Sequence, residues 1–285
     1  MDPELTGGPG RIPEMPLIAE LASIGLEPVP RWAEQDKPVI IADGEAFRLK
    51  ELRSAIRADR ARVVGLRPAD LERFGALLQT RALALYDMQV EDLSPLRHLE
   101  GLEWLSLTWN TKVISLEPLA GLRSLTRLSI SDTPKVRDLE PIGALTHLVA
   151  LNYSGGIWNR ATAETLEPLT RLEALEELVL TNIKVLEGGL RPLARCTGLR
   201  ALELSNQFET AEYAYLSVAL PDAVCRHFAP YVPLEVDGMR ADVMVVGRRK
   251  PFLDSKRDSD RLARYVAEFE RLQAGFRREL GAASA

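Results

Sequence analysis

The spacing of leucine constrains this 285-residue chain more than any other feature. Between Leu93 and Leu204, a span of 112 residues, 27 positions are leucine. They follow the pattern L-x-x-L-x-L, in which x is any residue and Ile or Tyr can replace the last leucine. Full copies begin at Leu102, Leu125, Leu148, Leu175 and Leu199, after a degenerate copy at Thr80. The starts are 22, 23, 23, 27 and 24 residues apart, and a period of this length indicates an array of stacked repeats.

A second motif, L-x-P-L, lies at a fixed place between these copies. It begins at Leu93, Leu116, Leu139, Leu166 and Leu190, with Ile as its last residue in the third copy. Proline fixes φ and lacks an N–H, which suits a short turn or a 3-10 stretch. In the first motif the last two leucines alternate with other residues, as in a strand with one buried face. One repeat cannot bury its own apolar face, so neighbouring repeats must stack.

These two motifs resemble the leucine-rich repeat family, and the short period is similar to that of internalins and phosphatase-regulator repeat proteins. The resemblance covers roughly residues 80–207 and implies about six repeats. It implies an α/β solenoid with a curved parallel sheet on the concave face and 3-10 or irregular returns on the convex face. The family carries an asparagine three residues after the last leucine of the strand. In this chain only Asn110 occupies that position, and Asn182 and Asn206 lie one position early. The resemblance favours a bacterial origin, and the 29 Arg against 7 Lys suggest a GC-rich genome.

A solenoid has open ends that need caps, and the N-terminal 79 residues are expected to provide one. Residues 1–29 are predicted to be flexible or partly helical, with a short helix over Pro16–Leu26. Residues 30–79 are predicted to form a cap of αβ character. Its expected elements are strands at Val39–Ile41 and Arg62–Leu66, an Asp43–Gly44 turn, and helices at Phe47–Ile56 and Ala69–Leu78.

Residues 208–285 are expected to cap the other end with a strand and a helix. The strand is predicted at Ala241–Val246, and the helix begins after an N-cap at Asp258 or Ser259. Apolar residues recur along this helix every three or four positions, at Leu262, Val266, Phe269, Leu272, Phe276 and Leu280. Its apolar side can cover the last repeat, or it can dock a partner or a second copy of the chain.

The residues between the strand leucines project onto the concave face, because side chains alternate across a strand. Equivalent residues of successive repeats form columns that begin at Ala82, Ala84 and Tyr86, and the first column contains Trp104 and Arg127. Most of them are small or hydroxylated, which predicts a flat, polar and accessible floor. Tyr86 and Trp104 stand out, since aromatic residues are enriched in binding hot spots. The expected partner contacts are Tyr86, Trp104, Ser106, Thr108, Arg127, Ser129, Asn152, Trp158, Glu177 and Glu203.

Trp158 belongs to an insertion that makes the fourth repeat 27 residues long. The extra residues fall in the segment 154–162, which contains the pair Gly155-Gly156. Insertions in solenoids map to loops, often on the binding side. We expect a mobile loop in which Trp158 is either a partner contact or a local staple.

Composition limits the other function classes. Acidic residues outnumber basic ones 41 to 36, which argues against a nucleic-acid partner. No apolar run reaches the length of about 18 residues that a membrane span needs, and the N-terminus lacks a signal-peptide pattern, so we expect a cytoplasmic protein without a membrane partner. With only Cys196 and Cys225, no disulfide framework and no four-cysteine metal site is expected.

Searches for catalytic motifs find no phosphate loop, dinucleotide fingerprint or nucleophile elbow, and no cofactor is expected. The sequence therefore favours a non-catalytic module that binds a protein or peptide, as an adaptor, regulator or inhibitor. One alternative is an enzyme with chemistry near Cys225 and His227, beside the basic run at 248–250. Another is a scaffold that self-associates through the C-terminal helix, which would make a homo-oligomer.

Overall fold

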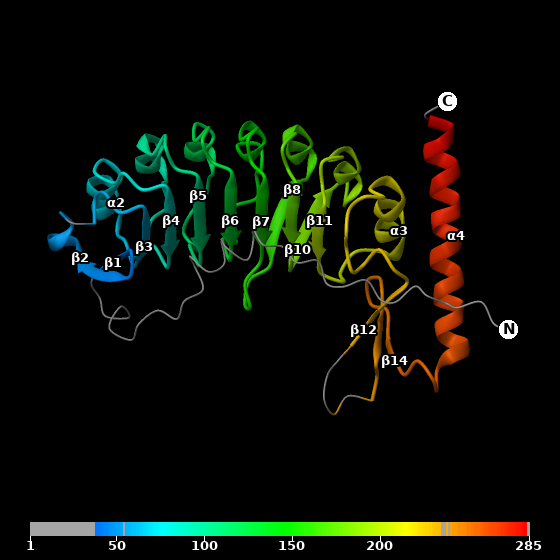
Figure 1. Ribbon diagram of the computed structural model, residues 1–285. Helices are drawn as coiled ribbons and strands as arrows, with labels where there is room; N and C mark the ends of the chain where they lie inside the picture. Colours follow the sequence, from blue (N-terminus) through cyan, green and yellow to red (C-terminus); the bar gives the residue numbers. More distant parts are fainter. Residues whose placement is uncertain (1–37, 54, 235–237, 239, 284–285) are drawn as a thin grey trace.

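The computed structural model describes residues 38–53, 55–234, 238 and 240–283. Its main feature is a nine-stranded sheet in the order β11-β9-β7-β6-β5-β4-β3-β1-β2 (Figure 1). Its parallel strands are β3 (Arg60–Val64), β4 (Ala82–Tyr86), β5 (Trp104–Thr108), β6 (Arg127–Ser131), β7 (Ala150–Ser154), β9 (Glu177–Leu180) and β11 (Ala201–Leu204). Each repeat contributes one of them, so the predicted leucine-rich repeat solenoid is confirmed. The parallel sheet starts at β3, one strand before the degenerate copy at Thr80.

The proline motifs form the return segments of the repeats. Four of them are short 3-10 helices that contain the proline, and the fifth starts directly after Pro141. Their bounds are η3 (Ser94–His98), η4 (Glu117–Leu119), η5 (Ile142–Ala144), η6 (Glu167–Arg171) and η7 (Arg191–Arg195). The predicted 3-10 returns are therefore confirmed.

The core lies between the sheet and the returns and extends through all repeats. The strand leucines are buried, and so are the leucines of the returns. Tyr153 takes the place of a strand leucine and is fully buried; its hydroxyl lies 2.9 Å from the carbonyl oxygen of Val136 and 3.0 Å from that of Thr162. Burial of each such side chain contributes about 1.5–3 kcal/mol, and only a neighbouring repeat can provide it.

At the N-terminal end, β1 (Val39–Ala42) pairs antiparallel with both β2 (Glu45–Arg48) and β3. The helix α2 (Pro68–Gly75) follows β3, as predicted. The predicted helix over Phe47–Ile56 is wrong, because the segment forms β2 and then the 3-10 helix η2 (Leu49–Glu51). The turn at Asp43 and Gly44, both at positive φ, folds β2 back onto the edge of β1, and this pairing overrides the local helical pattern. The expected helix over Pro16–Leu26 lies outside the described residues.

The C-terminal end is closed by α3 (Thr210–Ala219) and α4 (Ser259–Ala283), which stand side by side (Figure 1). Between them lies a small antiparallel sheet of β12 (Tyr231–Pro233), β13 (Val243–Val245) and β14 (Phe252–Leu253). The ring of Phe276 meets Tyr215 of α3 edge-on at 5.3 Å, and Phe269 is buried. The apolar side of α4 therefore covers the end of the stack, as predicted, while self-association through α4 stays a prediction. No helix of the described ranges is long and apolar enough to cross a membrane.

Asn110 connects two repeats from inside the core. Its side-chain amide donates to the carbonyl of Leu85, and its carbonyl oxygen accepts from the N–H of Met88, both at 2.9 Å. The equivalent residue in the next repeat is Thr133, which is fully buried but whose hydroxyl has no hydrogen-bond partner among the described residues. Asn110 thus forms hydrogen bonds between repeats, whereas the equivalent Thr133 hydroxyl forms none within the described residues.

We expect Asn110→Ala to lower the free energy of unfolding by about 2 kcal/mol, because it leaves the N–H of Met88 buried without its partner and removes the bond to the carbonyl of Leu85. Thr133→Val, at the same repeat position, should change stability by less than about 1 kcal/mol, since it removes a hydroxyl that makes no bond. Urea unfolding monitored by circular dichroism measures both. Equal losses for the two variants would contradict the role assigned to Asn110.

Candidate functional site

Strand register defines columns of side chains on the concave face, in the order that the repeat predicted. The first column is Arg60, Ala82, Trp104, Arg127, Ala150, Glu177 and Ala201. The second column is Arg62, Ala84, Ser106, Ser129, Asn152, Val179 and Glu203. Neighbours in a column are about 4.8 Å apart, so each column forms a continuous line across the sheet.

Three residues of the first column form what we call the arginine–tryptophan cluster: Arg60, Trp104 and Arg127. The guanidinium carbons of Arg60 and Arg127 lie 5.7 and 4.4 Å from the centroid of the Trp104 ring. Within the described ranges, no carboxylate is within 4.0 Å of either guanidinium. The Nε of Arg127 is buried without a hydrogen-bond partner. The cluster therefore combines an aromatic surface with two positive charges that the described chain does not neutralise.

The cluster borders a hollow of about 260 Å³ at the N-terminal ends of the strands. It is lined by Asp59, Arg60, Arg81, Ala82, Glu103, Trp104 and Arg127. Ala82 stands between Arg60 and Trp104 in the column, and its short side chain leaves room there. Arg81 and Glu103 neutralise each other at 2.7 Å. The uncompensated positive charge of the hollow is therefore that of Arg60 and Arg127, which Asp59 alone partly offsets.

The sequence did not predict Arg60 and Arg62 as members of the columns, because they lie on β3, one strand before the degenerate repeat. The signal was present: in Arg60-Ala61-Arg62-Val63, polar and apolar residues alternate as in the later strands. Arg62 is only 7% exposed, and its guanidinium carbon lies 5.4 Å from the centroid of the Tyr86 ring. This contact anchors Tyr86, a predicted partner contact, on the sheet.

Trp109 also lies outside the predicted columns. It follows β5 with a φ of +59°, a left-handed conformation that costs a bulky residue about 1 kcal/mol or more. The equivalent residues Asp87 and Asp132 tolerate this conformation better. The ring of Trp109 meets Tyr86 edge-on at 5.8 Å. The pair forms an exposed aromatic edge at the C-terminal ends of the strands, opposite the arginine–tryptophan cluster.

The middle of the concave face is polar but less open than predicted. Ser106 and Ser129 are buried, and Thr108 is half-buried with its hydroxyl 3.3 Å from that of Ser106. The side chain of Asn152 donates to the hydroxyl of Ser129 at 3.0 Å and accepts a short hydrogen bond from Ser154. The hydroxyls thus bond to one another across strands, and the expectation of an accessible floor is wrong there.

The C-terminal part of the face is acidic. Glu177 is 7% exposed, whereas Glu203 on the last strand is exposed. The concave face therefore changes sign along its length, from Arg60 on β3 and Arg127 on β6 to the carboxylates on β9 and β11.

The insertion in the fourth repeat carries Ile157 and Trp158, which are 90% and 82% exposed. We call these two residues the apolar tip. The chain between β7 and β8 projects beyond the ends of the strands (Figure 1). Because Trp158 is so exposed, the local-staple interpretation is wrong. Trp158 stays a predicted partner contact.

Hydrogen bonds to other repeats hold the base of this insertion, and the mobility of its tip stays a prediction. Asn159 donates to the carboxylate of Asp132 at 2.9 Å, and Asn182 donates to the carbonyl of Gly156 at 2.7 Å. A Cβ on Gly156 would collide with the carboxyl group of Asp132. The chain then forms β8 (Ala161–Thr165), which pairs parallel with β10 (Ile183–Glu187). The apolar tip thus stands on a fixed base.

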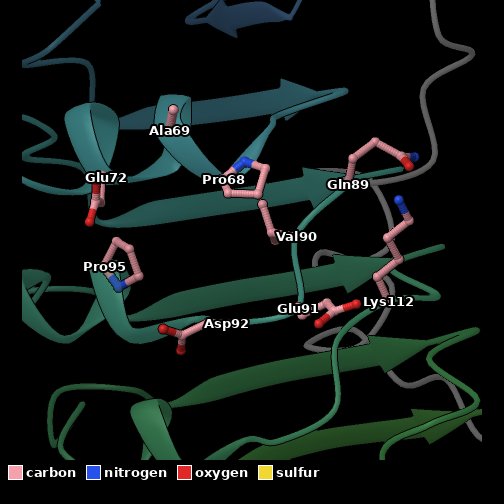
Figure 2. A pocket seen from close by; sticks show the side chains of 9 residues that line it. All are labelled: Pro68, Ala69, Glu72, Gln89, Val90, Glu91, Asp92, Pro95 and Lys112. Atoms are coloured by element: carbon pink, nitrogen blue, oxygen red, sulfur yellow. The ribbon is translucent and has the colours of Figure 1, made fainter.

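A larger hollow of about 520 Å³ lies on the flank, between α2 and the turn after β4 (Figure 2). Its lining is Pro68, Ala69, Glu72, Gln89, Val90, Glu91, Asp92, Pro95 and Lys112. The carboxylate of Asp92 accepts hydrogen bonds from the N–H and hydroxyl of Ser94, which lower its pKa. These bonds are those of a turn, and the hollow contains none of the predicted site residues.

Cys225 and His227 are both buried in the C-terminal cap. Burial raises the pKa of the Cys225 thiol to about 12 and lowers the pKa of His227 to about 4. The imidazole packs on Tyr213 with 5.5 Å between ring centroids, and neither ring nitrogen has a hydrogen-bond partner among the described residues. A thiolate is scarce at neutral pH under these conditions, so the pair has the properties of core residues.

A search of protein-family models finds no match to this chain, and a search of curated proteins finds none either. Among solved structures, the chain is similar to an internalin of Listeria monocytogenes with 21% identity and a TM-score of 0.45, over 74% of this chain and 54% of that chain. It is also similar to internalin C2 of the same organism, with 18% identity and a TM-score of 0.35, over 57% of this chain and 86% of that one.

A leucine-rich repeat protein of Leptospira interrogans shows 16% identity and a TM-score of 0.37, over 54% of this chain and 44% of that chain. The chain thus spans about half the length of the first internalin and of this protein. The repeat architecture is established by the strand order and register of the chain itself.

We expect Trp158→Ala to change the free energy of unfolding by less than about 0.5 kcal/mol, because the side chain is exposed and supports nothing. Asn159→Ala, in the base of the same insertion, should cost about 1 kcal/mol through the lost bond to Asp132. Urea titration of both variants provides the measurement. A larger loss for Trp158→Ala than for Asn159→Ala would restore the staple interpretation.

Acid should destabilise the protein through His227. The unfolded chain binds a proton below the ordinary histidine pKa of 6.5, whereas the folded chain resists it until about pH 4. The His227 contribution is therefore present above pH 6.5 and is lost as pH falls to 4, by about 3 kcal/mol in total. His227→Phe should flatten this part of the profile, measured by urea unfolding from pH 8 to pH 4. Exposed His98→Gln serves as the control, and an unchanged profile in His227→Phe would contradict the assignment.

Proposed function

We propose that the chain is a non-catalytic module that binds an extended segment of a protein or peptide along the concave face of its sheet. The observation that carries the proposal is the arginine–tryptophan cluster. Trp104 is a half-buried aromatic held between two arginines beside a hollow. Aromatic and arginine side chains that can become fully desolvated are the usual anchors of protein interfaces.

The apolar tip supports a second contact with a folded partner. Ile157 and Trp158 are large and exposed, and hydrogen bonds hold the base of the loop that carries them. Binding would therefore lose little conformational entropy in the backbone of this loop. By holding a partner through both regions, this chain would act as an adaptor, regulator or inhibitor. Cytoplasmic location and the absence of enzymatic activity stay predictions.

Trp104→Ala tests the concave face. A displayed library of random 12-residue peptides is selected on the wild-type protein, and the recovered peptides are synthesised. We expect Trp104→Ala to weaken their binding about 30-fold, which corresponds to a hot spot of about 2 kcal/mol. Affinities are measured by calorimetry or fluorescence anisotropy.

The matched control is Phe252→Ala, which removes an aromatic side chain of 52% exposure from β14 in the C-terminal cap. It should leave the affinities unchanged. If all recovered peptides bind wild type and Trp104→Ala equally, or depend on Phe252 instead, the concave face is not the binding site and the proposal fails.

A further inference from the structure

We propose that the concave face selects its ligand by charge order: anionic groups of the ligand lie over the arginine–tryptophan cluster, and a cationic group lies toward Glu203. This inference rests on the proposed function and names the chemistry of the partner. It places the ligand across the strands, so that it meets β3 to β6 at one end and β11 at the other.

The anion site is built from Arg60 and Arg127. Each guanidinium lies over Trp104, which restricts its motion, and Arg127 donates from Nη1 to the hydroxyl of Thr126 at 3.4 Å. The Nε of Arg127 is buried and makes no hydrogen bond within the described ranges, so a ligand oxygen meets the Nη groups of this side chain. A carboxylate matches the two-pronged edge of a guanidinium, and a phosphate offers the same oxygen chemistry.

The hollow beside the cluster gives the anion a place. Its volume of about 260 Å³ is large enough for a side-chain carboxylate, and Ala82 contributes only a methyl group to its lining. The neighbouring arginine, Arg81, does not compete for the anion, because Glu103 already binds it through both Nε and Nη2. An anion in the hollow would therefore meet Arg60 and Arg127, the cations without a carboxylate partner.

The opposite end of the face fixes the direction. Six strand steps separate β3 from β11 in the sheet, which is about 29 Å at 4.8 Å per step. An extended segment of about nine residues spans this distance. Between Arg127 on β6 and the carboxylates on β9 and β11, the face offers Ala150 and hydroxyls that already bond to one another, and neither holds a charge of the ligand. The positive charges therefore lie on β3 and β6 and the negative charges on β9 and β11, and this order gives the ligand one direction along the face.

The peptides recovered by the 12-residue library provide the test. We expect an excess of Asp and Glu at one end and of Lys and Arg at the other. Arg127→Glu should weaken the recovered peptides about 30-fold or more, since it places like charges in contact. Glu203→Lys should weaken them less, about threefold, because that carboxylate is exposed to water. Arg123→Glu, an exposed arginine of a return, makes the same charge change away from the face and should have no effect.

Melting curves establish that each variant folds, and Arg127→Gln replaces Arg127→Glu if the latter does not. Synthetic copies of one recovered peptide, with Glu replaced by Gln or by phosphoserine, identify the anion. Loss of binding in the Gln copy supports a carboxylate, and tighter binding of the phosphoserine copy identifies phosphate as the preferred source.

Two outcomes would overturn the charge order while leaving the proposed function intact. The recovered peptides could require Trp104 but show no segregation of charge, or Arg127→Glu could bind them as well as wild type does. Peptides that do not require Trp104 would instead remove the proposed function and the inference together.

Discussion

The stacking of repeats is the constraint on which the rest of the structure depends. Each L-x-x-L-x-L strand presents one apolar face, and only the next repeat and the proline-containing return can cover it. The two ends have no such neighbour, and both are closed by elements outside the repeat pattern: β1 and β2 at one end, α3 and α4 at the other. The caps therefore follow from the same requirement as the repeats.

Stacking also determines what the concave face can present. Because neighbouring strands are in register, equivalent residues of successive repeats line up about 4.8 Å apart. A substitution in one repeat changes one step of a column and leaves the core unchanged. Trp104 and Arg127 are such substitutions at positions that carry alanine in other repeats, such as Ala82 and Ala150. The face can thus acquire a binding site without a change of fold.

The sequence predicted the repeat, the 3-10 returns, the strand register and the C-terminal helix, because each depends on a local pattern that recurs or alternates. It did not predict β2, since the pairing of Glu45–Arg48 with β1 depends on a turn and on an available sheet edge. It placed Trp104 and Arg127 in one column but did not include Arg60, which precedes the recognisable leucine pattern. The sequence did not predict the hydrogen bonds at the base of the insertion, because Asp132 and Asn182 belong to other repeats and no local sequence pattern indicates such bonds.

The internal bonding of the hydroxyls has a consequence for how such a face binds. Ser129, Asn152 and Ser154 already satisfy one another, so a ligand gains little by replacing those bonds. Affinity must then come from other parts of the face, above all from β3 to β6, where Trp104 offers apolar area and the arginines offer charge. The apolar part is insensitive to salt, whereas the charged part weakens as ionic strength shortens the Debye length. A face of this kind holds its ligand by an aromatic anchor and orients it by charge.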